Sequence, residues 1–200
     1  MIREIFPRFA DPFVVITNFL DDELNKTLTE KVQNFSKTWV GKGREIWESA
    51  EKSPKNSFGL DEHSEVNEFN LLSMKVTEEV QDLGNYLGSS HKFVLKNAWY
   101  NLYNKNNFQE YHVHSPCLFS AIYFCKIPEG SSPVTFFDFS RQAKALPSIS
   151  YSPDENPMFI DSFIGGSEEN SLIIFRSHIP HNVRFGDNDD DRITFSFNFD

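Results

Sequence analysis

Apolar residues near the start of the chain change from a continuous run to a helical spacing. The run Phe13–Ile16 follows Pro12 and predicts a short strand. Asp21 or Asp22 then stands where a helix N-cap is expected, and the helix would continue to about Lys37. Its inward-facing residues recur every three or four positions and are Leu24, Leu28, Val32 and Phe35. This region therefore predicts a strand followed by an amphipathic helix.

A second helical spacing covers 65–87. Gly88 is suited to end this helix, because glycine readily adopts the left-handed conformation found just beyond a helix C-terminus. The inward-facing residues are predicted to be Phe69, Leu72, Met74 or Val76, Val80 and Leu83. The polar stretch 42–64, which contains glycine and proline, lies between the two helices and predicts a long loop.

The pattern changes at Phe93, after which short apolar runs alternate with turn residues. The chain has 21 phenylalanines, and most of them lie in runs with β-favouring neighbours. The predicted strands are Phe93–Tyr103, Cys117–Ile127, Val134–Phe139, Leu172–Phe175 and Ile193–Phe199. Helices followed by a run of strands predict an α+β chain whose second half is a sandwich or barrel.

The last predicted strand separates polar from apolar side chains most clearly. Its even-numbered residues from Arg192 to Asn198 are polar, and its odd-numbered residues from Ile193 to Phe199 are apolar. The apolar face is predicted to be core. The polar face either meets solvent, as on most amphipathic strands, or looks into a cavity. In a cavity, the guanidinium of Arg192 and the hydroxyl of Thr194 would bind a carboxylate.

Composition and length limit the domain number, the partners and the location to be expected for this chain. At 200 residues the chain is predicted to be one domain, 1–200, with 1–90 as a helical preface and first strand and 91–200 as the strand-rich core. A net charge of −10 argues against a protein whose affinity depends on nucleic-acid phosphates. Cys117 and Cys125 lie roughly 26 Å apart in one predicted strand, too far for a disulfide. Without a signal peptide or a membrane span, a cytoplasmic location is expected.

Four of the six histidines lie in two tight clusters. His112 and His114 are one residue apart in an extended segment, so their side chains project to the same side and could chelate a metal ion. A third ligand is predicted from the second cluster, with His181 favoured over His178 because Pro180 restricts the preceding turn and the last strand follows. The alternative is that these histidines are ordinary core or surface residues.

The order of these features resembles the iron(II)- and 2-oxoglutarate-dependent dioxygenases, and in particular a viral and bacterial subgroup with a His-x-His…His motif. The resemblance covers about residues 93–199. The segments that carry it are Asn101–Tyr103, His112–His114, Ser120–Phe124, Leu172–Phe175, His181 and Arg192–Thr194, with Arg192 eleven residues after His181.

This resemblance implies a double-stranded β-helix, a jelly-roll or cupin-like barrel, with the N-terminal helices packed against it. It also implies an enzyme that couples oxidative decarboxylation of 2-oxoglutarate to hydroxylation of a substrate that the sequence does not identify. Metal ligands would be His112, His114 and His181. The 2-oxoglutarate carboxylate would pair with Arg192, assisted by Thr194, with Tyr103 and Asn101 touching the co-substrate. No catalytic residue beyond the metal ligands is required.

His114 departs from the pattern of most of this superfamily, which has a carboxylate at that position. Three histidines would leave the full charge of the ion for the 2-oxoglutarate dianion to offset. If His114 does not bind, Glu110 or Asp138 could supply an acid, or a water molecule could fill the position. The alternatives to the oxygenase are a cupin-like isomerase, a dioxygenase without co-substrate, and a non-enzymatic jelly roll. Arg192 and Thr194 discriminate between the oxygenase and a cupin, because a cupin has no need of a carboxylate clamp after its distal histidine.

Overall fold

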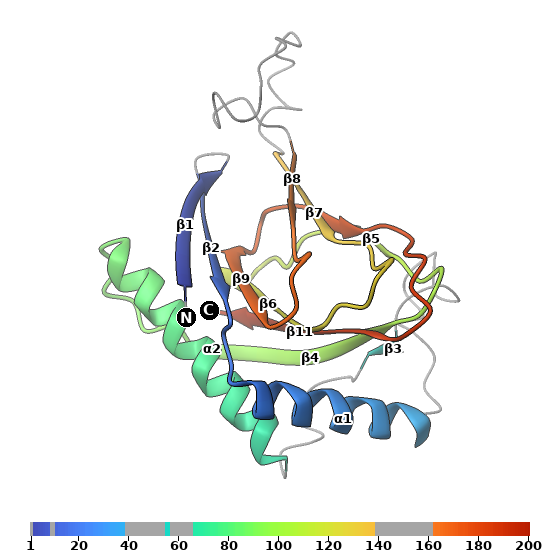
Figure 1. The fold of residues 1–200 in the computed structure, drawn as a ribbon. Coiled ribbons are helices and arrows are strands. Elements are labelled where there is room, and N and C mark those ends of the chain that lie inside the picture. The colour runs from blue at the N-terminus through green and yellow to red at the C-terminus, as the bar shows by residue number, and fades with distance from the viewer. Residues whose placement is uncertain (1, 9–10, 39–54, 57–65, 139–161) are drawn as a thin grey trace, which may run out of the picture.

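The structure, a computed structural model, describes residues 2–8, 11–38, 55–56, 66–138 and 162–200. Its helices and strands are shown in Figure 1 and are β1 (Ile2–Arg8), β2 (Asp11–Thr17), α1 (Asp22–Thr38), β3 (Lys55–Asn56), α2 (Asn67–Tyr86), β4 (Leu95–Tyr103), β5 (Gln109–His112), β6 (Phe119–Lys126), β7 (Val134–Phe137), β8 (Ser162–Gly165), β9 (Ser171–Arg176), β10 (His181–Val183) and β11 (Arg192–Phe199).

The strands from β4 onward pair in a nested order. The first pairs with the last, β4 with β11, and inside that pair lie β5 with β10, β6 with β9 and β7 with β8, all antiparallel. The result is a large sheet in the order β1-β2-β9-β6-β11-β4-β3 and a small sheet in the order β5-β10-β7-β8. This is the double-stranded β-helix of the jelly-roll class, and the predicted α+β fold is confirmed.

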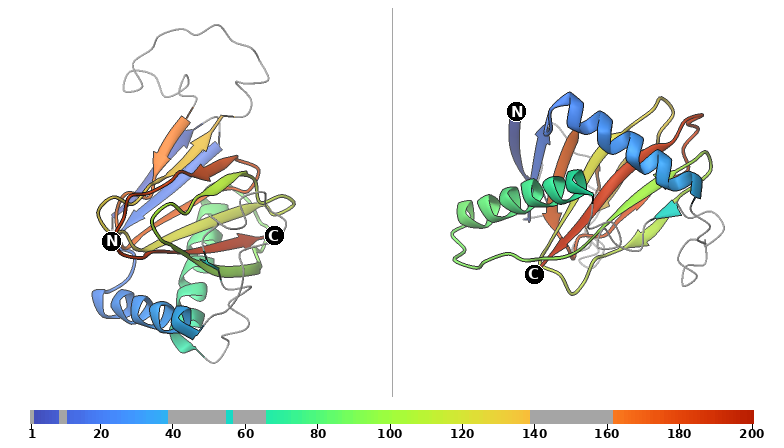
Figure 2. Two further views of the ribbon diagram at one scale, coloured as in Figure 1. Left: turned by 90° about the vertical axis from the view of Figure 1, so that its right-hand side faces the viewer. Right: turned by 90° about the horizontal axis from the view of Figure 1, so that it is seen from below.

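Both helices cover the outer face of the large sheet (Figure 2). The carboxylate of Asp21 caps α1 by accepting a hydrogen bond from the backbone N–H of Leu24, with 2.8 Å between the heavy atoms. Gly88 follows α2 with a φ of 76°, a conformation that glycine adopts without steric cost. The predicted helices are thus confirmed within a few residues at each end. On α2 the inward-facing residue is Val76, while Met74 is exposed.

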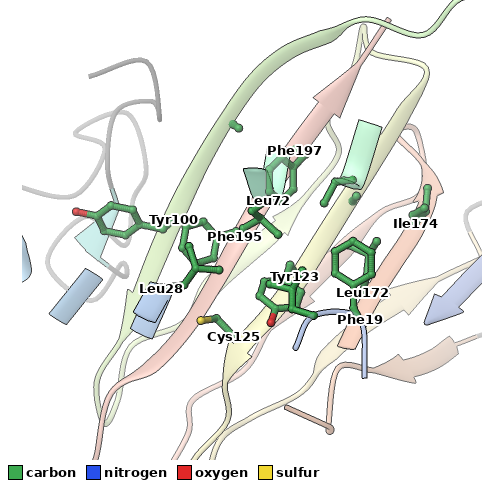
Figure 3. Packing of buried hydrophobic residues seen from close by; sticks show 14 of the residues in the cluster. Phe19, Leu28, Leu72, Tyr100, Tyr123, Cys125, Leu172, Ile174, Phe195 and Phe197 are labelled. Carbon is green, nitrogen blue, oxygen red and sulfur yellow. The ribbon is translucent and has the colours of Figure 1, made fainter. Parts of the chain in front are cut away.

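The large sheet has a buried core on each of its faces. The outer core lies between the sheet and the helices, and Figure 3 shows Phe195 and Phe197 of β11 there with Leu28 of α1 and Leu72 of α2. The inner core lies between the two sheets and is smaller; it includes Phe136. β11 has all of its residues buried, so its polar residues lie inside the barrel and not at the surface.

Several strands lie outside the predicted set. In the N-terminal segment the predicted strand at Phe13–Ile16 is confirmed as β2, which pairs with β9, whereas β1, which pairs with β2, was not predicted. Short β5, β8 and β10 form most of the small sheet. The predicted loop 42–64 falls mostly outside the described residues, and within it Lys55–Asn56 forms β3. No helix in the described ranges is long and apolar enough to cross a membrane.

Candidate active site

Antiparallel pairing of the small sheet brings the two histidine clusters together. His112 ends β5 and His181 begins β10, and the two residues are directly paired in the register of these strands. His114 lies two residues beyond His112, and its backbone N–H donates to the carbonyl of Ser177. The ligand atoms of the three histidines all lie within 4.8 Å of one another. The structure therefore brings the three predicted metal ligands to one point.

Hydrogen bonds orient two of the three imidazole rings through backbone carbonyls. His112 Nδ1 lies 2.6 Å from the carbonyl oxygen of Glu110, and His181 Nδ1 lies 3.1 Å from that of Ile179. A carbonyl oxygen only accepts, so in both rings Nδ1 carries a proton, and in the neutral ring the lone pair is on Nε2. A neutral imidazole in this tautomer is the form that binds a metal ion.

The distance between the rings fits a shared cation. His112 Nε2 and His114 Nε2 are 3.0 Å apart. Two imidazole nitrogens bound at a right angle, each about 2.1 Å from one ion, would be separated by about 3 Å. If both rings carry their proton on Nδ1, two lone pairs face each other at this distance, and a cation between them removes the repulsion. The donor set and its spacing thus fit a metal ion.

Burial keeps the third histidine neutral. His181 is 2% exposed, and desolvation lowers its pKa well below the ordinary value, with the neighbouring His112 and His114 adding to the effect. His178, the other member of its cluster, is instead on the surface and contacts the carboxylate of Asp11. Among the described residues no carboxylate joins the three histidines.

Arg192 lies in the same pocket, with its guanidinium beside Tyr103. It is 1% exposed, and within the described part of the chain none of its three guanidinium nitrogens has an acceptor. Its guanidinium carbon lies 4.6 Å from the ring centre of Tyr103 and 5.8 Å from that of Phe124. Burial lowers the pKa of Arg192 and raises the pKa of the Tyr103 hydroxyl, while the closeness of these two groups shifts both pKa values in the opposite direction by a smaller amount. A buried cation held against aromatic faces, with no counter-ion among the residues that the structure describes, is suited to bind an anion.

Neighbouring side chains form a polar row between Arg192 and the histidines. The Asn101 amide donates to Ser196 Oγ at 3.1 Å and, at 3.4 Å, to Thr194 Oγ1. The indole N–H of Trp99 donates to Asn101 Oδ1 at 3.1 Å. Because Thr194 accepts from Asn101, its own proton is available to a ligand. The space bounded by these residues, the histidines and Arg192 is about 370 Å³, including the open solvent at its mouth.

All of the site residues predicted from the sequence line this pocket, namely the three histidines, Arg192, Thr194, Tyr103 and Asn101, but the rest of the lining was missed. Trp99, Gln109 and Ser196 also line the pocket. Trp99 and Ser196 were detectable in principle, since they share strand parity with Tyr103 and Arg192. Gln109 belongs to β5, which lacks the apolar alternation that marks a strand.

A jelly-roll barrel with a histidine cluster and a buried arginine in one pocket is compatible with a non-haem metal-dependent enzyme. The sequence profile of the family described as "Putative 2OG-Fe(II) oxygenase" matches residues 97–198, just over half of the chain. The chain belongs to this family. It is accordingly an iron(II)- and 2-oxoglutarate-dependent oxygenase, with Fe(II) as cofactor and 2-oxoglutarate as co-substrate. No curated protein is similar enough in sequence to count as a match.

Solved structures of low sequence identity share the fold. A prolyl-4-hydroxylase of Pseudomonas putida has a TM-score of 0.62 at 14% identity, over 94% of this chain and 91% of that one. A prolyl hydroxylase of Trichoplax adhaerens, solved with a hypoxia inducible factor peptide fragment, has 0.65 at 14% identity, over 94% and 82%. The non-heme alpha ketoglutarate dependent epimerase SnoN of nogalamycin biosynthesis has 0.69 at 12% identity, over 94% and 76%.

Proposed function

We propose that His112, His114 and His181 hold the iron, that Arg192 binds 2-oxoglutarate, and that the enzyme hydroxylates a substrate that neither sequence nor fold identifies. One observation carries the proposal: a buried guanidinium with no hydrogen-bond acceptor among the described residues shares a pocket with three histidines whose ligand atoms lie within 4.8 Å of one another. The guanidinium and the histidine cluster together suit an anion that contacts both a metal ion and an arginine.

The metal ligands proposed here are all neutral. Most of the superfamily supplies two histidines and one carboxylate, so an ion in this site keeps one more unit of positive charge. Imidazole nitrogen suits iron as well as zinc, copper and nickel, so the donor set is compatible with Fe(II). The extra charge favours a dianionic co-substrate, because 2-oxoglutarate offsets both the ion and Arg192.

Arg192 and its neighbours are proposed to bind the carboxylate of 2-oxoglutarate that lies away from the metal. A guanidinium offers a planar fork of donors that matches a carboxylate, and Thr194 Oγ1 offers one more donor. Tyr103 holds the guanidinium in place through its ring and keeps its hydroxyl protonated as a further donor. Asn101 is proposed to act mainly by orienting Thr194 and Ser196.

When bound, iron and 2-oxoglutarate supply the oxidising chemistry: one oxygen atom of dioxygen enters succinate as carbon dioxide is lost, and the other enters a C–H bond of the substrate. The chain itself binds and orients these groups. Phe136 and Phe175 pack against His181 with ring centres 5.5 and 5.1 Å away, which limits water on that side. A cupin-like isomerase or a dioxygenase without co-substrate would leave Arg192 buried without a function.

Isotope transfer from dioxygen tests this proposal. The protein would be incubated with Fe(II), 2-oxoglutarate and labelled dioxygen, with and without small molecules and peptides from a cell extract. We expect label in succinate, and a 2-oxoglutarate-dependent product that gains one labelled oxygen atom. His181→Ala should abolish both, whereas His178→Ala, which removes an exposed histidine outside the cluster, should leave both unchanged. Labelled succinate at the wild-type rate in His181→Ala would overturn the metal assignment, and labelled succinate without any oxygenated product would overturn hydroxylation.

A further inference from the structure

His114 is held differently from the other two histidines. It lies beyond the end of β5, and its Nδ1 lies 2.7 Å from Oδ1 of Asn198 on β11, in the opposite sheet. Asn198 is 6% exposed. The backbone carbonyls that orient His112 and His181 can only accept a hydrogen bond, whereas a side-chain amide can present either an acceptor or a donor. The proton position on His114 therefore depends on which way the amide of Asn198 points.

Three further contacts determine the orientation of this amide. Ser120 Oγ donates to Asn198 Oδ1 at 2.8 Å, and Ser120 Oγ lies 2.8 Å from Ser177 Oγ. Asn198 Nδ2 donates to Asn97 Oδ1 at 2.8 Å. Both serines are fully buried, so their hydroxyl protons need acceptors inside the protein. With Oδ1 facing His114, the chain Ser177 to Ser120 to Asn198 gives each hydroxyl proton an acceptor.

The opposite orientation would have a chemical consequence at the metal site. If Asn198 presented Nδ2 to His114, the ring nitrogen Nδ1 would have to accept, and the ring proton would move to Nε2. That proton would then point toward His112 Nε2, 3.0 Å away, and would occupy the lone pair that a metal ion needs. One amide thus selects between a ring that can bind a metal ion and a ring that cannot.

We propose that Asn198 is the positioning residue for His114, fixing its Nδ1–H tautomer so that Nε2 faces the metal position. The inference rests on the proposed function in one respect, the use of Nε2 as a ligand atom. The amide, unlike a carboxylate, adds no charge, so His114 serves as a neutral ligand. Asn198 also links His114, which lies outside the strands, to β11. This contact fixes the distance of His114 from His112 and His181.

Histidine tautomers are measurable by nitrogen NMR on the metal-free protein, which separates this inference from the proposed function. In the wild-type protein we expect His114 to carry its proton on Nδ1. Asn198→Ala should produce a mixture with Nε2–H and weaken Co(II) binding by about 10- to 100-fold, the usual range for a lost hydrogen bond behind a metal ligand. Asn198→Asp keeps only acceptors, so it should retain the Nδ1–H tautomer and bind Co(II) at least as tightly as wild type.

Two more variants keep the test decisive if Asn198→Ala folds poorly. Asn97 is exposed and accepts the hydrogen bond that orients the amide of Asn198. Asn97→Ala removes this acceptor. It should raise the Nε2–H population of His114, with a smaller loss of Co(II) affinity than Asn198→Ala. Asn25→Ala is the matched control, because Asn25 is 8% exposed and hydrogen-bonds Tyr123 on the opposite face of the sheet. It should lower stability without changing the tautomer or the Co(II) affinity.

Three results would overturn the inference: an Nε2–H proton on His114 in wild type, an unchanged tautomer in both Asn198→Ala and Asn97→Ala, or an equal loss of Co(II) affinity in Asn25→Ala. Failure of the proposed function has a different signature. In that case wild type does not bind Co(II), while the tautomers of the metal-free variants still decide the role of Asn198.

Discussion

On the outer face of the large sheet, Phe195 and Phe197 of β11 pack against both helices, whereas on the inner face Arg192 and Thr194 of the same strand line a pocket. All four residues are at most 2% exposed. They differ in what surrounds them. Phe195 has aromatic neighbours on three sides, with ring centres of Phe69, Tyr100 and Tyr123 between 5.5 and 6.4 Å away. The nitrogens of Arg192 have no hydrogen-bond partner among the described residues.

The same degree of burial therefore stabilises the folded chain at the phenylalanines of the outer face and destabilises it at the arginine of the inner face. Apolar burial stabilises the folded chain by roughly 1.5–3 kcal/mol for a large side chain. Burial of a charge without a partner costs free energy, which a ligand of opposite charge can offset on binding. The outer core is the larger of the two apolar cores, and we infer that the buried charge on the inner face lowers stability in favour of ligand binding, as functional sites commonly do. The following changes would break or sharpen this contrast.

The largest effect is expected on the outer face. Phe195→Ala should lower the free energy of unfolding by about 3–5 kcal/mol, because the cavity it leaves is enclosed by other aromatic rings. Urea unfolding followed by circular dichroism measures this loss. Folded Phe195→Ala should still bind 2-oxoglutarate, since the side chain points away from the pocket. A loss below about 1 kcal/mol would mean that the outer core is not the main source of stability.

Arg192→Met should separate stability from binding. Replacing a buried, unpartnered charge by an apolar side chain of similar length should leave the metal-free, co-substrate-free protein as stable as wild type or more stable, by up to about 3 kcal/mol. The affinity for 2-oxoglutarate, measured by calorimetry, should fall by at least about 100-fold as two charge-assisted hydrogen bonds are lost. Metal binding should remain. A destabilisation as large as that of Phe195→Ala would contradict the assignment of Arg192 to ligand binding.

A smaller change on the inner face tests the hydroxyl of Thr194. Thr194→Val keeps the shape of the side chain and should change the free energy of unfolding by less than about 1 kcal/mol. The affinity for 2-oxoglutarate should fall roughly tenfold, which corresponds to one hydrogen bond to a charged group. Thr135→Val on β7 is the control, since Thr135 is also buried but does not line the pocket. Equal affinities in the two variants would remove Thr194 from the co-substrate site.

The smallest expected effect is a difference in chemical reactivity between the two cysteine thiols. Cys125 lies in the outer core at 0% exposure, and desolvation raises its pKa to about 12, whereas Cys117 is partly exposed. We therefore expect a chromogenic thiol reagent to modify one cysteine of the native protein and both in urea. Cys125→Ser and Cys117→Ser identify which one reacts. Fast modification of Cys125 under native conditions would show that the outer core opens readily.

Most of the helices and strands with a regular spacing of apolar residues could be predicted from the sequence. Helix spacing predicted both helices, and the alternation of polar and apolar residues in β11 was enough to separate Arg192 from Phe195. The fold class was predicted from the order of elements and the family resemblance. Strands that lack alternation were missed, among them β5 and β10, although they carry His112 and His181. Three or four residues are too few for a period to be recognised.

A local irregularity in β4 limits what strand alternation can predict. A strictly alternating strand places Leu95 on the same face as Asn97 and Asn101, but Leu95 packs against the outer core. The register of β4 against β11 shifts between Asn198 and Phe199, so a β-bulge reverses the alternation at that end of the strand. The contact between Asn198 and His114 could not be predicted either, because it joins two sheets through residues far apart in sequence.

The central claim is that the inner face binds an iron ion and 2-oxoglutarate at adjoining positions. An anaerobic titration of the protein with Fe(II) and then 2-oxoglutarate tests it most directly. We expect a weak visible charge-transfer band when both are present, and no band with Fe(II) alone or with 2-oxoglutarate alone. The band should be absent in His181→Ala, require far more 2-oxoglutarate in Arg192→Met, and be unchanged in His178→Ala. No band in the wild-type protein, or an undiminished band in His181→Ala, would contradict the account.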